Sequence, residues 1–446
     1  MGKRIEFLFL FLATFIERHK RHIGLGTIIG FFVTLFILQI YPLYNQIFGV
    51  KEERIGLIGQ YTENTIPLII KNQISLGLTS LTQSGEASPS LALSWNMEPD
   101  GLKYTFHLKP NYYWHDQTKF TSKDINYKLK NVTFTPLDEN TITVTLKEDN
   151  QFSPLPVILS QPLFKNNLVG LGNYKVSRIK YNGDYISELT LHPLKSTLAP
   201  IKYRFYPNKD EAILAFKLGE INIIENLSDA SEFKNWQNLK ITEVNMFDRF
   251  VGIFLNLRDQ NFKEKEIRQG LNYAVPRFDK FEKAYTPISP LSWAYSSKIR
   301  LYRYDPDIAK KILSKSPMSS SSSELTISTY SSLVDIAQTV ADAWNKIGIK
   351  TKIKVEASIP ADYEVFILTL AIPSDPDQYQ YWQSTQDITN ISHYSNLKID
   401  KLLEDGRKTS DQEKRKKIYA DFQRYLVDDS PVIFLYHPKQ YIVERK

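Results

Sequence analysis

The sequence predicts an α/β protein of two or more lobes, preceded by one transmembrane helix. Three observations support this prediction. Strand-like and helix-like patterns alternate through the outer part of the chain. The chain has 446 residues, which is long for one compact domain. Residues 23–50 contain no charged side chain, and most of that run is apolar.

The composition is that of a globular protein without cysteine chemistry. Apolar residues make up 42% of the chain and charged residues 24%, which excludes disorder along the whole chain. The lack of cysteine excludes disulfides, thiolate metal sites, cysteine nucleophiles and a lipid-modified cysteine. The net charge of +7 is not concentrated in a basic patch outside the N-terminal segment, so no nucleic-acid partner is expected.

The N-terminal segment predicts a single-pass membrane protein. Residues 1–22 are expected to form a basic cytoplasmic leader and residues 23–44 the anchor. Nineteen helical residues from Ile23 to Tyr41 span roughly 28 Å, close to the ~30 Å of a bilayer core. The cluster ERHKRH before the anchor should stay in the cytoplasm, which places the C-terminal domain on the extracytoplasmic side of the cell membrane. A cleaved signal peptide is the alternative, but its apolar core would be shorter.

The stretch DGLKYTFHLKPNYYWHDQTKFTSKDI (residues 100–125) predicts a strand, a turn and a helix. Every second residue of its first part is apolar, as in a half-buried strand. Thr121 to Asp124 matches a capping box, so a helix should begin there and continue through Ile125. His115 and Asp116 lie in the turn between strand and helix, without a partner motif for metal binding or catalysis.

Later segments continue the alternation of helix and strand. One apolar stripe has helical spacing and ends before Gly348. The members of this stripe are Leu333, Ile336, Ala337, Val340, Ala341 and Trp344. Residues 349–356 alternate as a strand, and residues 363–372 are apolar on both faces, like a strand covered by helices. Residues 431–436 predict a final strand, and residues 316–324 a serine-rich linker.

Motifs for catalysis are absent from the sequence. The chain has no zinc-protease spacing, nucleophile elbow, phosphate-binding loop or dinucleotide fingerprint. The chain has seven histidines, and no two of the five outside the basic leader stand at ligand spacing. We therefore expect a protein that is not an enzyme, with no catalytic residue, metal site or cofactor.

Several blocks, in their order, resemble the extracellular solute-binding proteins of the oligopeptide, dipeptide and nickel class, family 5, which serve ABC importers. The resemblance covers roughly residues 55–443. Its blocks include LALSWNMEPDGLKYTFHLKPNYYWHDQTKFTSKDI, LVGLGNYKV, EAILAFKLGEINII, FLNLRDQNFKEKEIRQGLNYAVPR, SDPDQYQYW and DDSPVIFLYHP. In this family the His-Asp pair belongs to a structural turn, and Gln117 stands where a glycine is usual.

The resemblance implies a type II periplasmic-binding-protein clamshell within residues 51–446. The first lobe is expected at about 51–250, with a reduced inserted domain within 82–167 and a C-terminal return at 430–446. The second lobe is expected at about 251–429. Closure of the two lobes about a hinge would trap the ligand.

The implied function is a membrane-anchored receptor that captures peptides or related solutes and delivers them to the permease subunits of an ABC importer. The alternative is the same fold used as a surface sensor or scaffold without transport. A monomer is expected. By block position, the residues expected near the ligand are Tyr61, Asn256, Trp293, Asp375, Tyr379 and Trp382.

One departure from the family concerns the ligand's charge. Peptide-binding relatives often carry an aspartate where Ile372 stands, and this aspartate can pair with a peptide's free ammonium. Two alternatives remain: Asp375 or another acid supplies the charge, or the ligand is not a free-amine peptide. The second is favoured, because a buried ammonium needs a paired carboxylate and Ile372 supplies none. Asp375 itself is expected to cap the turn that precedes residues 378–382.

Overall fold

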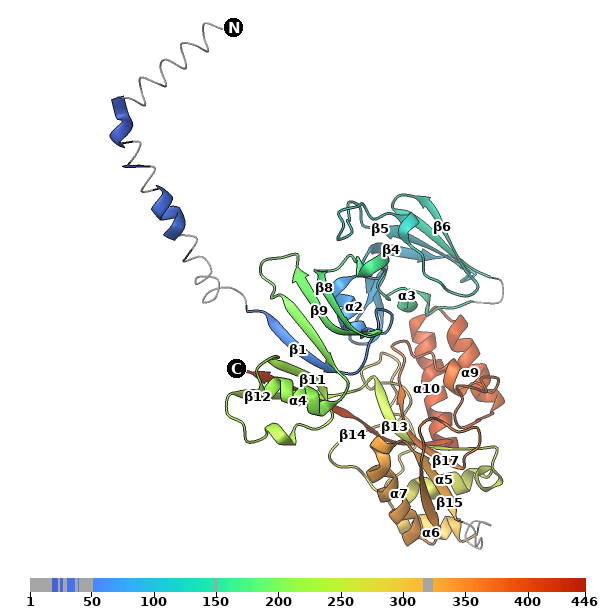
Figure 1. Cartoon of the computed structure of the whole chain (residues 1–446). Helices are drawn as coiled ribbons and strands as arrows, with labels where there is room; N and C mark the ends of the chain where they lie inside the picture. The colour runs from blue at the N-terminus through green and yellow to red at the C-terminus, as the bar shows by residue number, and fades with distance from the viewer. Residues whose placement is uncertain are drawn as a thin grey trace.

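The computed structural model describes residues 18–22, 25–26, 30–36, 39, 51–147, 151–315 and 324–446 (Figure 1). Much of the expected leader and anchor, and nearly all of the serine-rich linker, lie outside these residues. Among the described residues, no helix combines the length and the apolar character needed to cross a membrane. The described residues from Lys51 onward form a first lobe, an inserted domain and a second lobe.

The first lobe is built on a seven-stranded sheet in the order β12-β19-β11-β1-β10-β9-β8. Its strands are β1 (Glu53–Ile58), β8 (Tyr174–Asn182), β9 (Tyr185–Pro193), β10 (Ile201–Tyr206), β11 (Ile223–Leu227), β12 (Leu239–Asn245) and β19 (Lys439–Arg445). The helices are α2 (Leu68–Ile74) and α4 (Lys209–Lys217), with short 3-10 turns η2 (Asn166–Leu168) and η3 (Ser231–Phe233). The central strand β1 pairs in parallel with β10 and β11, as expected for strands joined through helices.

The inserted domain is a four-stranded antiparallel sheet in the order β4-β5-β7-β6. These strands are β4 (Ala92–Met97), β5 (Lys103–Leu108), β6 (Val132–Asp138) and β7 (Thr141–Leu146), followed by the short helix α3 (Leu155–Ile158). A two-stranded hairpin of β2 (Thr79–Leu81) and β3 (Ala87–Pro89) precedes the sheet. The predicted alternation along β5 is confirmed, because Tyr104, Phe106 and Leu108 are buried whereas His107 is exposed.

The helix predicted to continue through Ile125 is wrong. The capping box forms, with the Thr121 amide donating to the Asp124 carboxylate at 2.7 Å. It caps only one 3-10 turn, η1 (Ser122–Asp124), after which Ile125 is extended. The reason is tertiary: the Tyr127 hydroxyl donates to the Gln161 carbonyl oxygen at 2.8 Å across the domain. This contact favours an extended chain that leads into β6.

The second lobe is built on a six-stranded sheet in the order β14-β18-β13-β17-β15-β16. Its strands are β13 (Arg249–Leu255), β14 (Glu282–Lys283), β15 (Leu325–Thr329), β16 (Thr351–Val355), β17 (Val365–Ala371) and β18 (Val432–His437). Its helices are α5 (Lys265–Tyr273), α6 (Pro306–Leu313), α7 (Val334–Lys346), α8 (Tyr379–Trp382), α9 (Leu397–Lys408) and α10 (Gln412–Asp429), with 3-10 turns η4 (Gln260–Phe262) and η6 (Ser331–Leu333).

Two sequence predictions for this lobe are confirmed. The helical stripe faces the core along α7, where Ala337, Val340 and Trp344 are buried. The run that is apolar on both faces forms β17, which lies between β13 and β15 inside the sheet. A strand covered on both faces needs apolar residues at successive positions, which explains its pattern.

The chain crosses between the lobes at two adjacent points, which form the hinge. One crossing joins β12 to β13 and the other joins β18 to β19. The Met246 amide donates to the Pro438 carbonyl oxygen at 2.8 Å, so the two crossings are hydrogen-bonded to each other. The expected return segment, residues 430–446, therefore divides between the lobes, because β18 pairs with β13 whereas β19 pairs with β11 and β12.

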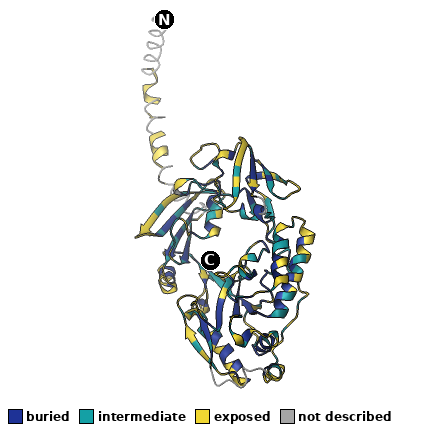
Figure 2. Ribbon diagram, turned by 90° about the vertical axis from the view of Figure 1, so that its right-hand side faces the viewer, coloured by how far each residue is buried: buried dark blue, intermediate teal, exposed yellow. Residues whose placement is uncertain are grey.

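Each lobe has its own buried core (Figure 2). In the second lobe the buried side chains form two clusters, and the first lobe and the inserted domain have clusters of their own. Among the described residues, no buried apolar cluster combines side chains of both lobes. A motion about the hinge therefore leaves every core intact, as hinge closure requires.

Candidate ligand cleft between the lobes

Away from the hinge, the two lobes meet again along a seam of polar contacts. The Trp293 amide donates to the Ser84 carbonyl oxygen at 3.3 Å, and the Ser153 amide to the Arg407 carbonyl oxygen at 2.8 Å. The seam is tight at Gly85, where a Cβ atom would lie 2.2 Å from the Ser374 carbonyl oxygen. Gly85 has a φ of +86°, which a side chain rarely adopts. The lobes are therefore in contact along the seam as well as at the hinge.

Three cavities lie along this seam, with volumes of about 620, 330 and 320 Å³. Residues of both lobes, or of the inserted domain and the second lobe, line each of them. Ligand sites commonly have such volumes and lie at interfaces between domains. The seam is therefore the candidate ligand cleft.

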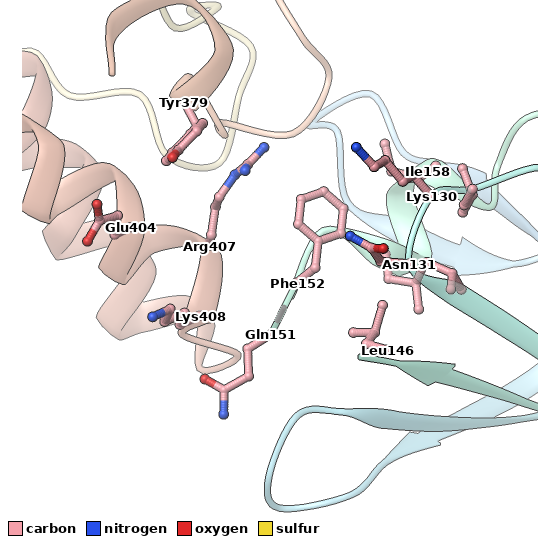
Figure 3. A pocket seen from close by; sticks show the side chains of 13 residues that line it. Lys130, Asn131, Leu146, Gln151, Phe152, Ile158, Tyr379, Glu404, Arg407 and Lys408 are labelled. Carbon is pink, nitrogen blue, oxygen red and sulfur yellow. The ribbon is translucent and has the colours of Figure 1, made fainter. Parts of the chain in front are cut away.

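The cavity of about 620 Å³, here called the basic cavity, lies between the inserted domain and α9 (Figure 3). Its apolar floor comes from the inserted domain and includes Val132, Leu146 and Phe152. Its charged lining residues are Lys130, Glu404, Arg407 and Lys408. Basic groups thus outnumber acidic ones around an apolar floor.

Arg407 is the central side chain of the basic cavity. Figure 3 shows it extending from α9 between Tyr379 and Phe152. The guanidinium lies 4.0 Å from the Tyr379 ring centre and 5.3 Å from that of Phe152, both within cation–π range. Its Nε atom donates to the Asp377 carboxylate at 2.9 Å. Burial raises the pKa of Asp377, and the nearby Arg407 charge opposes that rise.

The cavity of about 330 Å³, here called the Glu86 cavity, lies between the β2–β3 hairpin, β4, β5 and the start of α10. Its aromatic lining residues are Trp95, Tyr104 and Trp293, and its charged ones are Glu86, Asp375 and Arg415. Burial raises the pKa of Tyr104 to about 12, although the Arg415 charge opposes this, so the phenol stays neutral at ordinary pH. The Glu86 cavity thus combines aromatic walls with three charged groups.

Three of the six residues expected near the ligand line these cavities. Trp293 and Asp375 line the Glu86 cavity, and Tyr379 lines the basic cavity. The turn expected at Asp375 is present, since its carboxylate accepts a hydrogen bond of 2.9 Å from the Asp377 amide. The structure therefore brings these three side chains to the seam.

The other three expected residues have partners inside the lobes. The Tyr61 hydroxyl donates to the Ile58 carbonyl oxygen at 3.1 Å within the first lobe. The Asn256 amide group donates to the Tyr363 carbonyl oxygen at 2.7 Å, and Asn256 is buried. Trp382 is buried and its ring stacks on Phe254 in the core of the second lobe. None of the three lines one of the three seam cavities described above.

Glu86, Arg407 and Arg415 line the seam but carry no sequence signal of their own. Glu86 is the last residue of the loop between β2 and β3, Arg407 lies in the last turn of α9, and Arg415 lies in the first turn of α10. Charged residues at such positions are ordinary in soluble proteins. Only the pairing of segments far apart in the sequence brings the three together at the seam.

His115 and Asp116 form part of a turn. The His115 ring nitrogen Nε2 lies 3.0 Å from the Gly172 carbonyl oxygen, and Asp116 accepts a hydrogen bond of 3.0 Å from the Thr118 amide. Gln117 has a φ of 66°, a conformation that favours glycine, in agreement with the family's usual residue there. Among the described residues, no group of three His, Cys, Asp or Glu side chains is arranged to hold a metal ion.

Ile372 lies beside the hinge. It is buried, its amide donates to the Asp248 carbonyl oxygen at 2.6 Å, and it lines the cavity of about 320 Å³. An apolar side chain here offers no partner to a ligand's ammonium group. Any such partner has to come from another position along the seam.

Comparison with known proteins gives the same fold and family. The family model of bacterial extracellular solute-binding proteins, family 5, matches residues 86–390, more than half of the chain. The oligopeptide-binding protein AppA of Bacillus subtilis is 27% identical over 66% of this chain and 59% of its own length. The di/tripeptide-binding protein 1 of Pseudomonas aeruginosa is 25% identical over 87% of both chains.

Solved structures of similar proteins share the two-lobed fold. NikZ from Campylobacter jejuni, in complex with Ni(L-His), has a TM-score of 0.73 at 24% identity and covers 88% of this chain and 94% of its own. AppA from Bacillus subtilis, in complex with a nonapeptide, has a TM-score of 0.68 at 21% identity over 89% and 95% of the two chains. The fold is thus that of a periplasmic binding protein. The matching family model and the paired lobes identify the chain as a member of the family 5 solute-binding proteins of ABC importers.

Proposed function

We propose that this protein is a membrane-anchored receptor that captures peptides or related solutes outside the cytoplasm and delivers them to the permease subunits of an ABC importer. The observation that carries this proposal is the seam of three cavities between two lobes that share a hinge. Among the described residues, the two lobes have no buried apolar cluster in common. Such lobes can part to admit a ligand and close to bury it.

Peptides are the favoured class of ligand. The first two relatives described above are named for binding oligopeptides and di- or tripeptides. The seam itself supplies both polar and apolar surface, with charged groups in two cavities and an aromatic or apolar lining beside them. A peptide backbone needs polar partners, whereas varied side chains need roomy apolar space. The described cavities offer both kinds of surface, and the receptor is not expected to act as an enzyme.

Ligand identity is tested by extracting the full chain after purification without denaturation. Mass spectrometry of the extract should detect peptides, or solutes with peptide-like groups, at about one per chain. The same extract from a Gly85→Trp variant should contain far less, because the bulky ring would hold the lobes apart at Ser374. Equal recovery of the same molecules from both proteins would show that they bind elsewhere.

Membrane anchoring is proposed from the charge-free run at residues 23–50 and the basic cluster before it. Protease added to intact cells should digest the domain that begins near residue 51. Complete protection of that domain, with digestion after the cells are opened, would contradict the orientation. A mature form that begins after the apolar run and is released into the medium would contradict the uncleaved anchor.

A further inference from the structure

The Glu86 cavity contains one carboxylate without a cationic partner. Glu86 accepts a hydrogen bond of 2.7 Å from the Ser84 hydroxyl and one of 2.5 Å from the Gln412 side-chain amide. Both donors are neutral, and no Lys, Arg or His among the described residues forms an ion pair with Glu86. These two hydrogen bonds, that of Gln412 first, hold the pKa of Glu86 below its usual value, so the group is ionised at neutral pH.

The other two charges of the Glu86 cavity neutralise each other. Arg415 and Asp375 form a two-point ion pair, with nitrogen–oxygen distances of 2.7 and 3.2 Å and side chains only 7% exposed. The Arg415 Nε atom donates to the Gly406 carbonyl oxygen at 2.9 Å. Asp375 is therefore committed to Arg415, and Arg415 is already well supplied with acceptors. The cavity is left with the negative charge of Glu86.

The position of Glu86 suits a group that is bound as the lobes close. Ser84 belongs to the first lobe and Gln412 to the second, so Glu86 is held from both sides of the seam. The residue before it, Gly85, packs against the backbone of the second lobe. Opening of the lobes would remove the Gln412 hydrogen bond, because Gln412 belongs to the second lobe.

The walls of the Glu86 cavity also favour a cation. Trp95, Tyr104 and Trp293 line it from both lobes. Aromatic faces attract ammonium and guanidinium groups, and they repel anions. A carboxylate beside aromatic walls is thus complementary to a positively charged group with an apolar stem. The N-terminus of α10, which would attract an anion, is already capped by Asp411, whose side chain accepts from the Lys414 amide at 2.9 Å.

We propose that the Glu86 cavity binds the cationic group of the ligand, a primary ammonium or a guanidinium, with Glu86 as its charge partner. This inference rests on the proposed receptor function and names part of its ligand. It selects the first of the two alternatives left by Ile372: the acid is Glu86 rather than Asp375. The cation has two possible sources, the α-ammonium of a peptide or the side chain of a lysine or arginine.

The test is calorimetry of the full chain with three tripeptide probes. They are trialanine, N-acetyl-trialanine, and N-acetylated tripeptides that contain one lysine or arginine. The first probe should bind about threefold to fivefold more tightly than the second, because the Glu86 side chain is partly exposed and exposed charge pairs are weak. Recovery of affinity with the third probe would identify a side chain as a sufficient source of the cation. No recovery would assign the α-ammonium.

Two variants test whether the preference for a free amine depends on the Glu86 carboxylate. Glu86→Gln keeps the size of the side chain and should bring the affinities of trialanine and N-acetyl-trialanine within about twofold of each other. Glu86→Lys should reverse the preference. The matched control is Glu98→Gln in the same domain, whose carboxylate is exposed, pairs with Lys103 and lies outside the three seam cavities. The control should keep the wild-type preference, and thermal melting of each variant verifies folding.

The outcomes separate the inference from the proposed function. Tight binding of trialanine and its acetylated form with equal affinity would overturn the cationic subsite and leave the receptor function standing. A free-amine preference that persists in folded Glu86→Gln would overturn the role of Glu86. If none of the probes, nor an extract of natural peptides, binds the wild-type chain, the proposed function fails and the inference fails with it.

Discussion

Replacement of Asp375 by asparagine should strongly destabilise the second lobe. The carboxylate bonds two nitrogens of Arg415, and both side chains are 7% exposed. Asparagine can still accept from the Asp377 amide, so the turn keeps its hydrogen bond. Arg415 would keep a buried charge without a counter-charge. Removal of one partner from a buried ion pair costs about 3–5 kcal/mol, and the remaining exposure favours the lower end of that range.

The assay is guanidinium unfolding of the full chain, followed by tryptophan fluorescence. The Arg415 guanidinium lies 5.4 Å from the ring centre of Trp293, so this fluorophore lies beside the altered pair. The control is Asp387→Asn, which removes a surface pair with Arg258 whose side chains are 73% and 60% exposed. Such pairs contribute less than about 1 kcal/mol. A double variant, Asp375→Leu with Arg415→Met, should recover much of the loss because it buries no charge.

The result that would refute this reasoning is a loss of stability in Asp375→Asn no larger than in Asp387→Asn. Arg415 would then be solvated or paired elsewhere, and its role in neutralising Asp375 would be wrong. The negative net charge assigned to the Glu86 cavity would then lose its support, because that charge depends on the ion pair between Asp375 and Arg415. The measurement thus tests both the packing of the second lobe and a premise of the cationic subsite.

Two further predictions concern the seam and the hinge. Gly85→Ala should weaken peptide binding by about tenfold or more, because its Cβ would meet the Ser374 carbonyl oxygen at 2.2 Å. Gly183→Ala, also at positive φ but with no atom within 4 Å, should bind normally. Burial lowers the pKa of His437 below the usual 6.5, so the unfolded chain takes up a proton that the folded chain does not. The free energy of unfolding should therefore fall as the pH drops below about 6.5 and level off below the folded pKa. His437→Gln should remove that part of the pH profile, whereas exposed His107→Gln should retain it.

Elements whose burial follows from their own sequence could be predicted. The alternation along β5, the stripe of α7 and the continuous apolar run of β17 each report which faces of one element are covered. The helix expected after Thr121 failed because the cap is a local signal. Local signals give way when a distant contact, here that of Tyr127 with Gln161, favours an extended chain.

The candidate site could be predicted only in part. The turn role of Asp375 was evident, because the aspartate and the backbone amide it caps are two residues apart. Its ion pair with Arg415 spans forty residues, and the contact of Glu86 with Gln412 joins segments at opposite ends of the chain. The spacing of apolar and polar residues along the sequence does not predict such long-range contacts between side chains. Trp382 and Asn256 were expected near the ligand. Trp382 instead packs in the core of the second lobe, and the buried Asn256 donates a hydrogen bond within that lobe.

The central claim is that the lobes close on a ligand held at the seam. Small-angle X-ray scattering of the full chain, with and without saturating peptide, measures this most directly. The free protein should be more extended, and saturating peptide should lower the radius of gyration and raise the melting temperature through linkage. An unchanged radius of gyration at saturating peptide would contradict closure of the two lobes.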